Sequence, residues 1–212
     1  MKREVVNLAL VNKGLLVVLS APSGGGKDTV LAELKKRDLN MKQSVSATTR
    51  APREGEVDGV DYIFISSDEF KTKIGEGYFL EYVNYGSNWY GTPRKAVEKL
   101  IDDGYNVILK IEVEGAGNIK KVYPDAVSIF ISPPGFDVLK ARLKARGTET
   151  EQEFSGRVEI AKREYTRACE YDYVVINDDL QQCVDDICAI LKTEKYRYKR
   201  MKSFVDDIID NN

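Results

Sequence analysis

Residues 15–29, LLVVLSAPSGGGKDT, constrain what this chain can fold into more than any other stretch. A continuous apolar run leads into a glycine-rich turn, a lysine and the start of an amphipathic segment. This order is typical of a phosphate-binding loop, where backbone N–H groups and a helix N-terminus surround a phosphate chain. In the pattern G-x-x-x-x-G-K-[ST], the lysine reaches the β- and γ-phosphates and the final hydroxyl binds Mg²⁺. We therefore expect a nucleotide to bind here.

The loop departs from this pattern at two positions. Ala21 replaces the first glycine, and Asp28 replaces the hydroxyl residue that would bind Mg²⁺. The second departure matters more, because it changes the chemistry of the metal ligand. The residues predicted to bind the phosphates of the nucleotide are Ala21, Pro22, Ser23, Gly24, Gly25, Gly26, Lys27, Asp28 and Thr29.

The composition favours one α/β domain that binds anions only locally. At 212 residues the chain can bury a full core. Its 32 basic and 34 acidic residues nearly cancel, so no nucleic-acid or membrane partner is expected. No run reaches the ~20 apolar residues of a membrane-spanning helix. Three cysteines without any histidine argue against a disulfide framework or a zinc site and favour a cytoplasmic protein.

Apolar runs alternate with amphipathic segments along the rest of the chain, which predicts a three-layer α/β fold with a parallel sheet. After the first strand, further strands are expected at 106–112, 126–131 and 173–176. Lys110 interrupts the first of these, and a charged residue in a buried run requires a partner or a site. Helices are expected at 29–37, 93–102, 115–122, 136–144, 151–167 and 180–191, the last continuing in a charged form towards residue 209.

Residues 41–92 differ in composition and predict a small, mostly β insertion. The stretch 44–64, SVSATTRAPREGEVDGVDYIF, is polar and rich in turn residues, and it carries Arg50 and Arg53 close together. Guanidinium groups match phosphates bidentately, so the two arginines suit a clamp for a second phosphate. A solvated basic loop is the alternative, and two arginines alone would favour it. The other candidate members of the clamp are Ser46, Tyr62 and Tyr90.

Residues 142–169 are dense in charge and poor in apolar anchors, which predicts a segment that moves. Arg142, Arg146 and Arg157 suit a lid over a nucleotide, although a solvated helix face would show the same pattern. The predicted core then consists of residues 1–40, 93–141 and 170–212.

Taken together, these residues resemble the guanylate kinase family, which transfers the γ-phosphoryl group of ATP to GMP. The most specific segment is 44–64, supported by YGT at 90–92, EG at 114–115, RGTETE at 146–151 and INDDL at 176–180. The resemblance implies a single guanylate-kinase-like domain at 15–195. Its expected architecture is a P-loop NTPase-type sheet with an insertion at 41–92 that binds the nucleoside monophosphate and a helical lid at 142–169.

The resemblance also implies roles for individual residues. Lys27, Arg142, Arg146 and Arg157 are expected to be catalytic, Asn177 to lie near the adenine, and Mg²⁺ to accompany ATP. The residues expected to bind GMP are Ser46, Arg50, Arg53, Tyr62, Glu81, Tyr90, Thr92 and Glu112. A carboxylate can accept hydrogen bonds from N1–H and N2–H₂ of guanine, and adenine lacks that donor pair.

Two positions depart from the family together. The family usually has serine where Asp28 stands, and an LDID-type run where this chain has LKIE with Lys110 and Glu112. We hypothesise that the two changes compensate. Either Asp28 binds the metal, directly or through water, while Lys110 balances its charge, or the two form an ion pair beside the site. Independent drift is the alternative.

Two other functions compete with a cytoplasmic kinase of purine nucleotide metabolism that acts on GMP and dGMP. A ribose-bisphosphate kinase has a similar loop, and a guanylate-kinase-like scaffold would have lost catalysis. The segment 47–62 and Thr92 favour GMP over a sugar phosphate, and the retained Lys27 disfavours the scaffold. Both a monomer and a homodimer fit the sequence.

Overall fold

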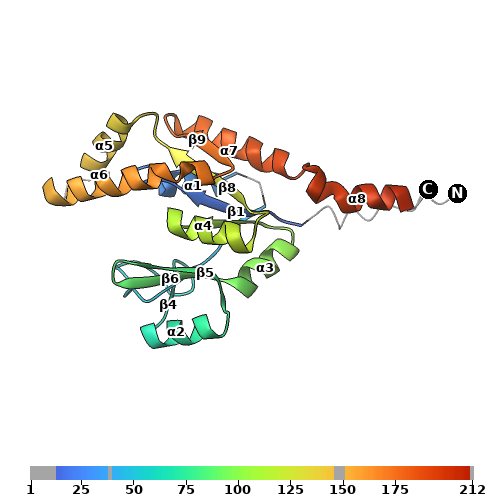
Figure 1. Ribbon diagram of the computed structural model, residues 1–212, viewed down its shortest axis with the longest axis horizontal. Coiled ribbons are helices and arrows are strands. Elements are labelled where there is room, and N and C mark those ends of the chain that lie inside the picture. The colour runs from blue at the N-terminus through green and yellow to red at the C-terminus, as the bar shows by residue number, and fades with distance from the viewer. Residues whose placement is uncertain (1–12, 38–39, 146–150, 211–212) are drawn as a thin grey trace.

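The computed structural model describes residues 13–37, 40–145 and 151–210. Two sheets organise them (Figure 1). The larger sheet has the strand order β2-β7-β1-β8-β9, and every neighbouring pair in it is parallel. Its strands are β1 (Leu16–Ser20), β2 (Met41–Gln43), β7 (Asn106–Lys110), β8 (Val127–Ser132) and β9 (Tyr173–Ile176). The parallel α/β fold predicted from the sequence is confirmed.

Two helix layers cover this sheet, and β1 shows why. All five of its residues are buried, and alternate side chains enter two different apolar clusters. Val17 and Leu19 pack with α1 (Lys27–Leu34) and α7 (Leu180–Glu194). Leu16 and Val18 pack with α3 (Arg94–Asp102) and α4 (Val113–Val122). Because successive side chains of a strand point to opposite faces, a continuous apolar run produces three layers.

The smaller sheet has the order β4-β3-β6-β5 and lies to one side of the larger one (Figure 1). Its strands are β3 (Ala47–Thr48), β4 (Ile63–Phe64), β5 (Phe79–Tyr85) and β6 (Asn88–Pro93). Phe70 of α2 (Ser67–Gly75) anchors it by stacking on Phe79 at a centroid distance of 4.4 Å. The predicted insertion began at residue 41, but β2 pairs with β7, so residues 41–43 belong to the larger sheet.

Helix α6 (Glu151–Thr166) lies within the expected lid at 142–169, and it shares an apolar core with α5 (Phe136–Lys144), whose last residues enter that lid. Leu139 and Leu143 of α5 pack against Val158 and Ala161 of α6. The expectation that residues 142–169 are poor in apolar anchors was therefore wrong for α6, whose Val158 and Ala161 are buried. Helical spacing brings together apolar residues that look sparse in the linear sequence.

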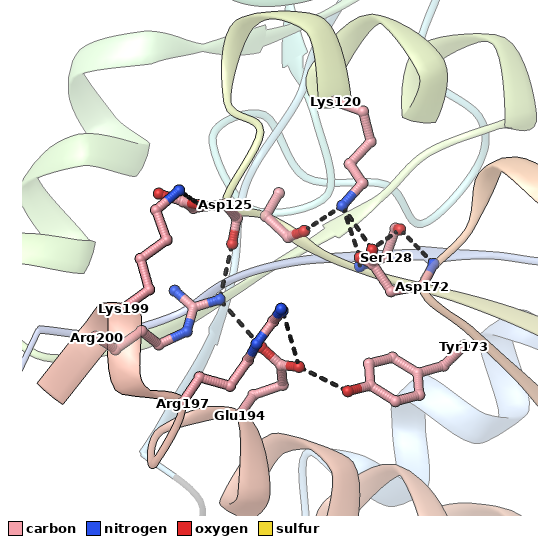
Figure 2. Close-up of polar contacts among 10 residues, drawn as sticks. Lys120, Asp125, Ser128, Asp172, Tyr173, Glu194, Arg197, Lys199 and Arg200 are labelled. Carbon is pink, nitrogen blue, oxygen red and sulfur yellow. Dashed lines mark hydrogen bonds and ion pairs between the residues drawn. The ribbon is translucent and has the colours of Figure 1, made fainter.

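The single C-terminal helix expected from residue 180 towards residue 209 is two helices. Between α7 and α8 (Tyr198–Asp210) the chain turns, and buried Glu194 is the centre of the contacts made there (Figure 2). Its carboxylate accepts a hydrogen bond from Tyr173 at 2.6 Å and lies 3.4 Å and 3.2 Å from the guanidinium groups of Arg197 and Arg200. A buried carboxylate requires such partners. Because the helix is interrupted here, both arginines can reach the Glu194 carboxylate. Within the described ranges, no helix is long and apolar enough to cross a membrane.

Candidate active site

The phosphate loop joins β1 to α1, and its glycines determine its shape. Gly24 and Gly26 have left-handed backbone conformations with φ of 84° and 90°, which glycine adopts without steric cost. A Cβ at Gly26 would lie only 2.4 Å from the side-chain nitrogen of Asn177. That nitrogen donates to the Gly25 carbonyl at 3.0 Å, so Asn177 supports the loop from β9. Its predicted place near the adenine stays a prediction.

Lys27 begins α1 and directs its ammonium group towards the end of β7. Nζ donates to a backbone carbonyl just after β7 at 3.2 Å and lies 3.0 Å from Oε1 of Glu112. A pocket of about 160 Å³ adjoins it, bounded by residues 21–28, Tyr85, Glu112 and Glu164. Glu112 was expected on the guanine, but its carboxylate pairs with Lys27 here. The guanine contact of Glu112 stays a prediction.

Asp28 and Lys110 form an ion pair, with Oδ1 and Nζ 2.9 Å apart. The sheet register explains the contact: Lys110 at the end of β7 lies opposite Leu19 of β1, and the chain then leads through the loop into α1. Burial lowers the pKa of Lys110, but the hydrogen bond and charge of Asp28 outweigh it and leave the pKa raised. The ion pair considered from the sequence is therefore observed, and metal binding by Asp28 stays a prediction.

The second predicted phosphate site centres on Arg50, which follows β3. Its Nη2 donates to both carboxylate oxygens of Glu56 at 2.7 Å and 2.9 Å, and its guanidinium lies 5.4 Å from the ring centre of Tyr62. Tyr62 and Tyr90 meet edge to face at 6.1 Å. The hydrogen bond from Arg50 lowers the pKa of Glu56. The structure thus gathers one arginine and two tyrosines of the predicted clamp.

The other two members of that clamp lie at its margins. Arg53 is exposed, and its backbone joins the cluster: its N–H donates to the Glu56 carboxylate at 2.7 Å, and its carbonyl accepts from the Glu56 N–H at 3.1 Å. Ser46 is half-buried just before β3, where its carbonyl accepts from the backbone of Ile63 at 2.9 Å. Both are adjacent to the Arg50 cluster, and their contacts with a phosphate remain predictions.

Glu81 and Thr92 form a buried polar pair between β5 and β6, where they are register partners. Thr92 donates to Oε1 of Glu81 at 2.7 Å, and Glu81 is only 6% exposed. Burial raises the pKa of Glu81 to about 7, although the hydrogen bond from Thr92 opposes the shift. The other carboxylate oxygen, Oε2, is buried without a hydrogen-bond partner among the described residues. A Cβ at Gly115 would lie 2.9 Å from that oxygen, so α4 approaches it closely.

Two side chains of α6 dock onto the phosphate loop. Arg157 donates to the Ser23 hydroxyl at 3.2 Å and 3.1 Å, and Glu164 accepts from the Ser23 backbone N–H at 3.0 Å. Arg142 of α5 donates to the Asn177 carbonyl at 2.9 Å. Two of the three predicted lid arginines are therefore beside the loop. The third, Arg146, lies outside the described residues.

A sequence model of the guanylate kinase family matches residues 13–194. The chain belongs to this family. Guanylate kinase from Halalkalibacterium halodurans is 47% identical over 189 residues, which cover 89% of this chain and 93% of that protein. The Clostridioides difficile guanylate kinase is 46% identical over 195 residues, covering 92% and 95%. A crystal structure of guanylate kinase from Anaplasma phagocytophilum superimposes with a TM-score of 0.73 at 35% identity, covering 89% and 90%.

The acidic residues of this guanylate kinase family member suit a Mg²⁺ ion that arrives with a nucleotide. Among the described residues, no group of three or more His, Cys, Asp or Glu side chains could hold a metal by itself. Mg²⁺ prefers oxygen ligands and is commonly held by one or two carboxylates together with substrate phosphates and water. Asp28 is 73% exposed at the first turn of α1 and provides such an oxygen beside the loop. The donor set therefore fits Mg²⁺ bound to nucleotide phosphates.

Three functional candidates were missed from the sequence: Glu56, Tyr85 and Glu164. Glu164 follows Arg157 by seven residues, so helical spacing places both on one face of α6 and would have signalled it. Glu56 follows Arg50 in the same turn-rich stretch, where its charge was the only signal. For Tyr85, which closes one side of the loop pocket, the sequence offers no signal.

Proposed function

We propose that this protein transfers the γ-phosphoryl group of ATP to GMP and forms ADP and GDP. The phosphate loop would bind the donor, and the Arg50 cluster would bind the acceptor phosphate. The observation that carries the proposal is the buried Oε2 of Glu81, an acceptor without a partner among the described residues. Guanine brings N1–H and N2–H₂ donors to such a carboxylate, while Thr92 supports the other oxygen. Adenine would leave the carboxylate unpaired, which costs roughly 1–3 kcal/mol or more for a charged group.

The reaction requires positioning and charge rather than covalent chemistry from the protein. The bond from the γ-phosphorus to the bridging oxygen of ATP breaks, and a bond from the γ-phosphorus to an oxygen of the GMP phosphate forms. Because the dianionic GMP phosphate carries no proton to remove, the reaction needs no general base. Lys27 would follow the transferred group, and Arg142, Arg146 and Arg157 would neutralise its charge from the lid. Bound Mg²⁺ would supply charge neutralisation between the phosphates, with Asp28 as one oxygen ligand, directly or through water.

The residues proposed to bind GMP also predict that dGMP is a substrate. The residues proposed for GMP contact its base and phosphate, so loss of the 2′-hydroxyl should be tolerated and dGMP should also react. We place this activity in purine nucleotide metabolism in the cytoplasm. The three free cysteines are consistent with a reducing compartment.

A coupled assay with ATP and one acceptor at a time tests the proposal. GMP and dGMP should be phosphorylated, while AMP and a ribose bisphosphate should not. Lys27→Met should lower kcat about 100-fold or more, as expected when a charge that stabilises the transition state is removed. Lys99→Met is the control, because Lys99 forms an exposed pair with Asp103 at the end of α3. Turnover of the ribose bisphosphate alone would favour the sugar kinase, and turnover of no acceptor would favour the inactive scaffold.

A further inference from the structure

Lys110 lies between the two halves of the proposed site. It ends β7 at the edge of the sheet where the phosphate loop begins, and its Nζ is 2.9 Å from Asp28 on the donor side. On the other side of β7, the chain that leaves β2 runs alongside, with the Ser44 N–H donating to the Ile108 carbonyl at 3.0 Å, and continues through Ser46 into β3 and the Arg50 cluster. Burial raises the pKa of Tyr62 in that cluster, and the charge of Lys110 opposes the shift. The end of β7, where Lys110 lies, thus adjoins both the donor loop and the segment that leads into the acceptor cluster.

The two partners of this ion pair differ in how firmly they are held. The Lys110 side chain is 29% exposed and belongs to a strand paired on both edges, whereas the Asp28 side chain is 73% exposed on the first turn of α1. The more exposed Asp28 carboxylate can turn towards a cation at the loop, whereas the backbone of Lys110 is held on both sides by the sheet. If the pair opens, Lys110 remains anchored at the edge of the sheet and loses the charge of Asp28.

We propose that the Asp28–Lys110 ion pair couples the two substrate sites: donor binding draws Asp28 away, and Lys110 then binds and positions the acceptor phosphate. This inference rests on the proposed function. A metal–nucleotide complex at the loop attracts the Asp28 carboxylate, and the unpaired ammonium becomes available to the phosphate beside Arg50. Because binding linkage is reciprocal, bound GMP must favour donor binding by the same factor. Lys110 acts here as a positioning residue for the acceptor phosphate. Its release depends on Asp28, the carboxylate that directly follows the loop lysine in this chain.

Calorimetric titration of GMP into the full-length protein tests this coupling without turnover. Each titration is made without a donor and again with saturating Mg²⁺ and a non-hydrolysable ATP analogue. The wild-type protein should bind GMP at least about five-fold more tightly with the donor present, the lower end of typical allosteric couplings. In Lys110→Met the donor effect should fall below about two-fold, while GMP affinity without a donor stays near the wild-type value.

Asp28→Ser provides the opposite signature. Removing the carboxylate frees Lys110 permanently, so GMP affinity without a donor should rise by about the wild-type coupling factor, and the donor should add little. The double variant should behave like Lys110→Met. Lys99→Met and Asp103→Ser make the same side-chain changes in an exposed pair 2.7 Å apart at the end of α3 and should keep the wild-type coupling. Thermal unfolding checks that every variant is folded, and Asp28→Asn and Lys110→Gln replace any variant that is not.

Several outcomes would overturn the proposal. Full coupling in Lys110→Met would show that lid closure or another contact links the sites. An unchanged or weaker GMP affinity in Asp28→Ser would show that Lys110 does not reach the acceptor phosphate. Wild-type protein that binds GMP without any donor effect refutes the coupling alone, whereas wild-type protein that does not bind GMP refutes the proposed function as well.

Discussion

The proposed role of Glu81 in binding guanine leads to a specific pH dependence, because this carboxylate is buried. Burial raises the pKa of Glu81 from 4.5 to about 7, and this group is only 6% exposed. Guanine needs the ionised carboxylate as its acceptor, so below pH 7 binding must first remove a proton. Affinity should therefore fall by about ten-fold per pH unit on the acid side and level off above the pKa.

The magnitude follows from the size of the shift. A change from 4.5 to about 7 corresponds to about 3 kcal/mol, since each pKa unit is about 1.4 kcal/mol. Ligand binding at pH 5.5 should be roughly 30-fold weaker than at pH 8. The same shift disfavours the ionised folded state, so this group lowers stability as pH rises from 4.5 to 7. Glu81→Gln should therefore stabilise the ligand-free protein at pH 8 and have little effect at pH 4.

Guanosine is the appropriate ligand for this measurement, because the phosphate of GMP itself titrates with a pKa of about 6. Calorimetry between pH 5.5 and 8.5 gives the affinity profile, and thermal unfolding over the same range gives the stability profile. In Glu81→Gln, any residual guanosine binding should lose its pH dependence. A flat guanosine profile for the wild-type protein would contradict the assignment of Glu81 to the base, whatever the stability profile shows.

Three further changes have defined outcomes. Gly115→Ala should raise the KM for GMP at least about ten-fold, because the new methyl group would lie 2.9 Å from Oε2 of Glu81. The Tm should change little, because alanine stabilises the helix by about 1 kcal/mol relative to glycine and offsets the crowding. An unchanged KM would show that Glu81 can move aside. Glu56→Gln should raise the KM for GMP about five-fold and leave kcat unchanged, because the guanidinium of Arg50 loses the charged partner that orients it. Steady-state kinetics measure both constants, and a lower KM would mean that Glu56 competes with the GMP phosphate for Arg50. Glu164→Gln should lower the KM for ATP about three-fold, because glutamine still accepts from the Ser23 N–H but removes a negative charge beside the bound phosphates. An unchanged KM would show that the Glu164 carboxylate leaves the loop when ATP binds.

Much of the fold was predictable because its central strands are buried on both faces. The buried strand β8 was predicted within one residue at each end, and the edge strand β9 and helix α5 were predicted at their observed limits. β2 was missed because it is a short edge strand with the polar sequence MKQ, whose pairing depends on β7 rather than on its own composition. The turn between α7 and α8 was missed because the residues around it favour helix locally. Only the tertiary contacts of Glu194 reveal why the helix is interrupted.

The candidate site was predictable to different degrees in its different parts. The phosphate loop has a local pattern with a known geometry, so its residues could be named directly. The Glu81–Thr92 pair came only from the family resemblance, because a glutamate in a strand and a threonine before a proline carry no signal for burial. The docking of Glu164 on the loop depends on how α6 packs on α5, and that packing uses side chains such as Leu139 and Val158, which looked too sparse to form a core.

The Asp28–Lys110 contact shows what separates the predictable from the unpredictable in this protein. The two residues are 82 positions apart, yet their pairing could be hypothesised because parallel strands deliver their carboxyl ends to one edge of the sheet. Once β1 and β7 are neighbours, register alone brings the end of β7 beside the phosphate loop. Glu112 is two residues beyond Lys110, and its pairing with Lys27 depends on rotamers that register does not set. Sheet topology therefore determines which charged residues meet at the loop, and substrate binding must determine which of them remain paired there.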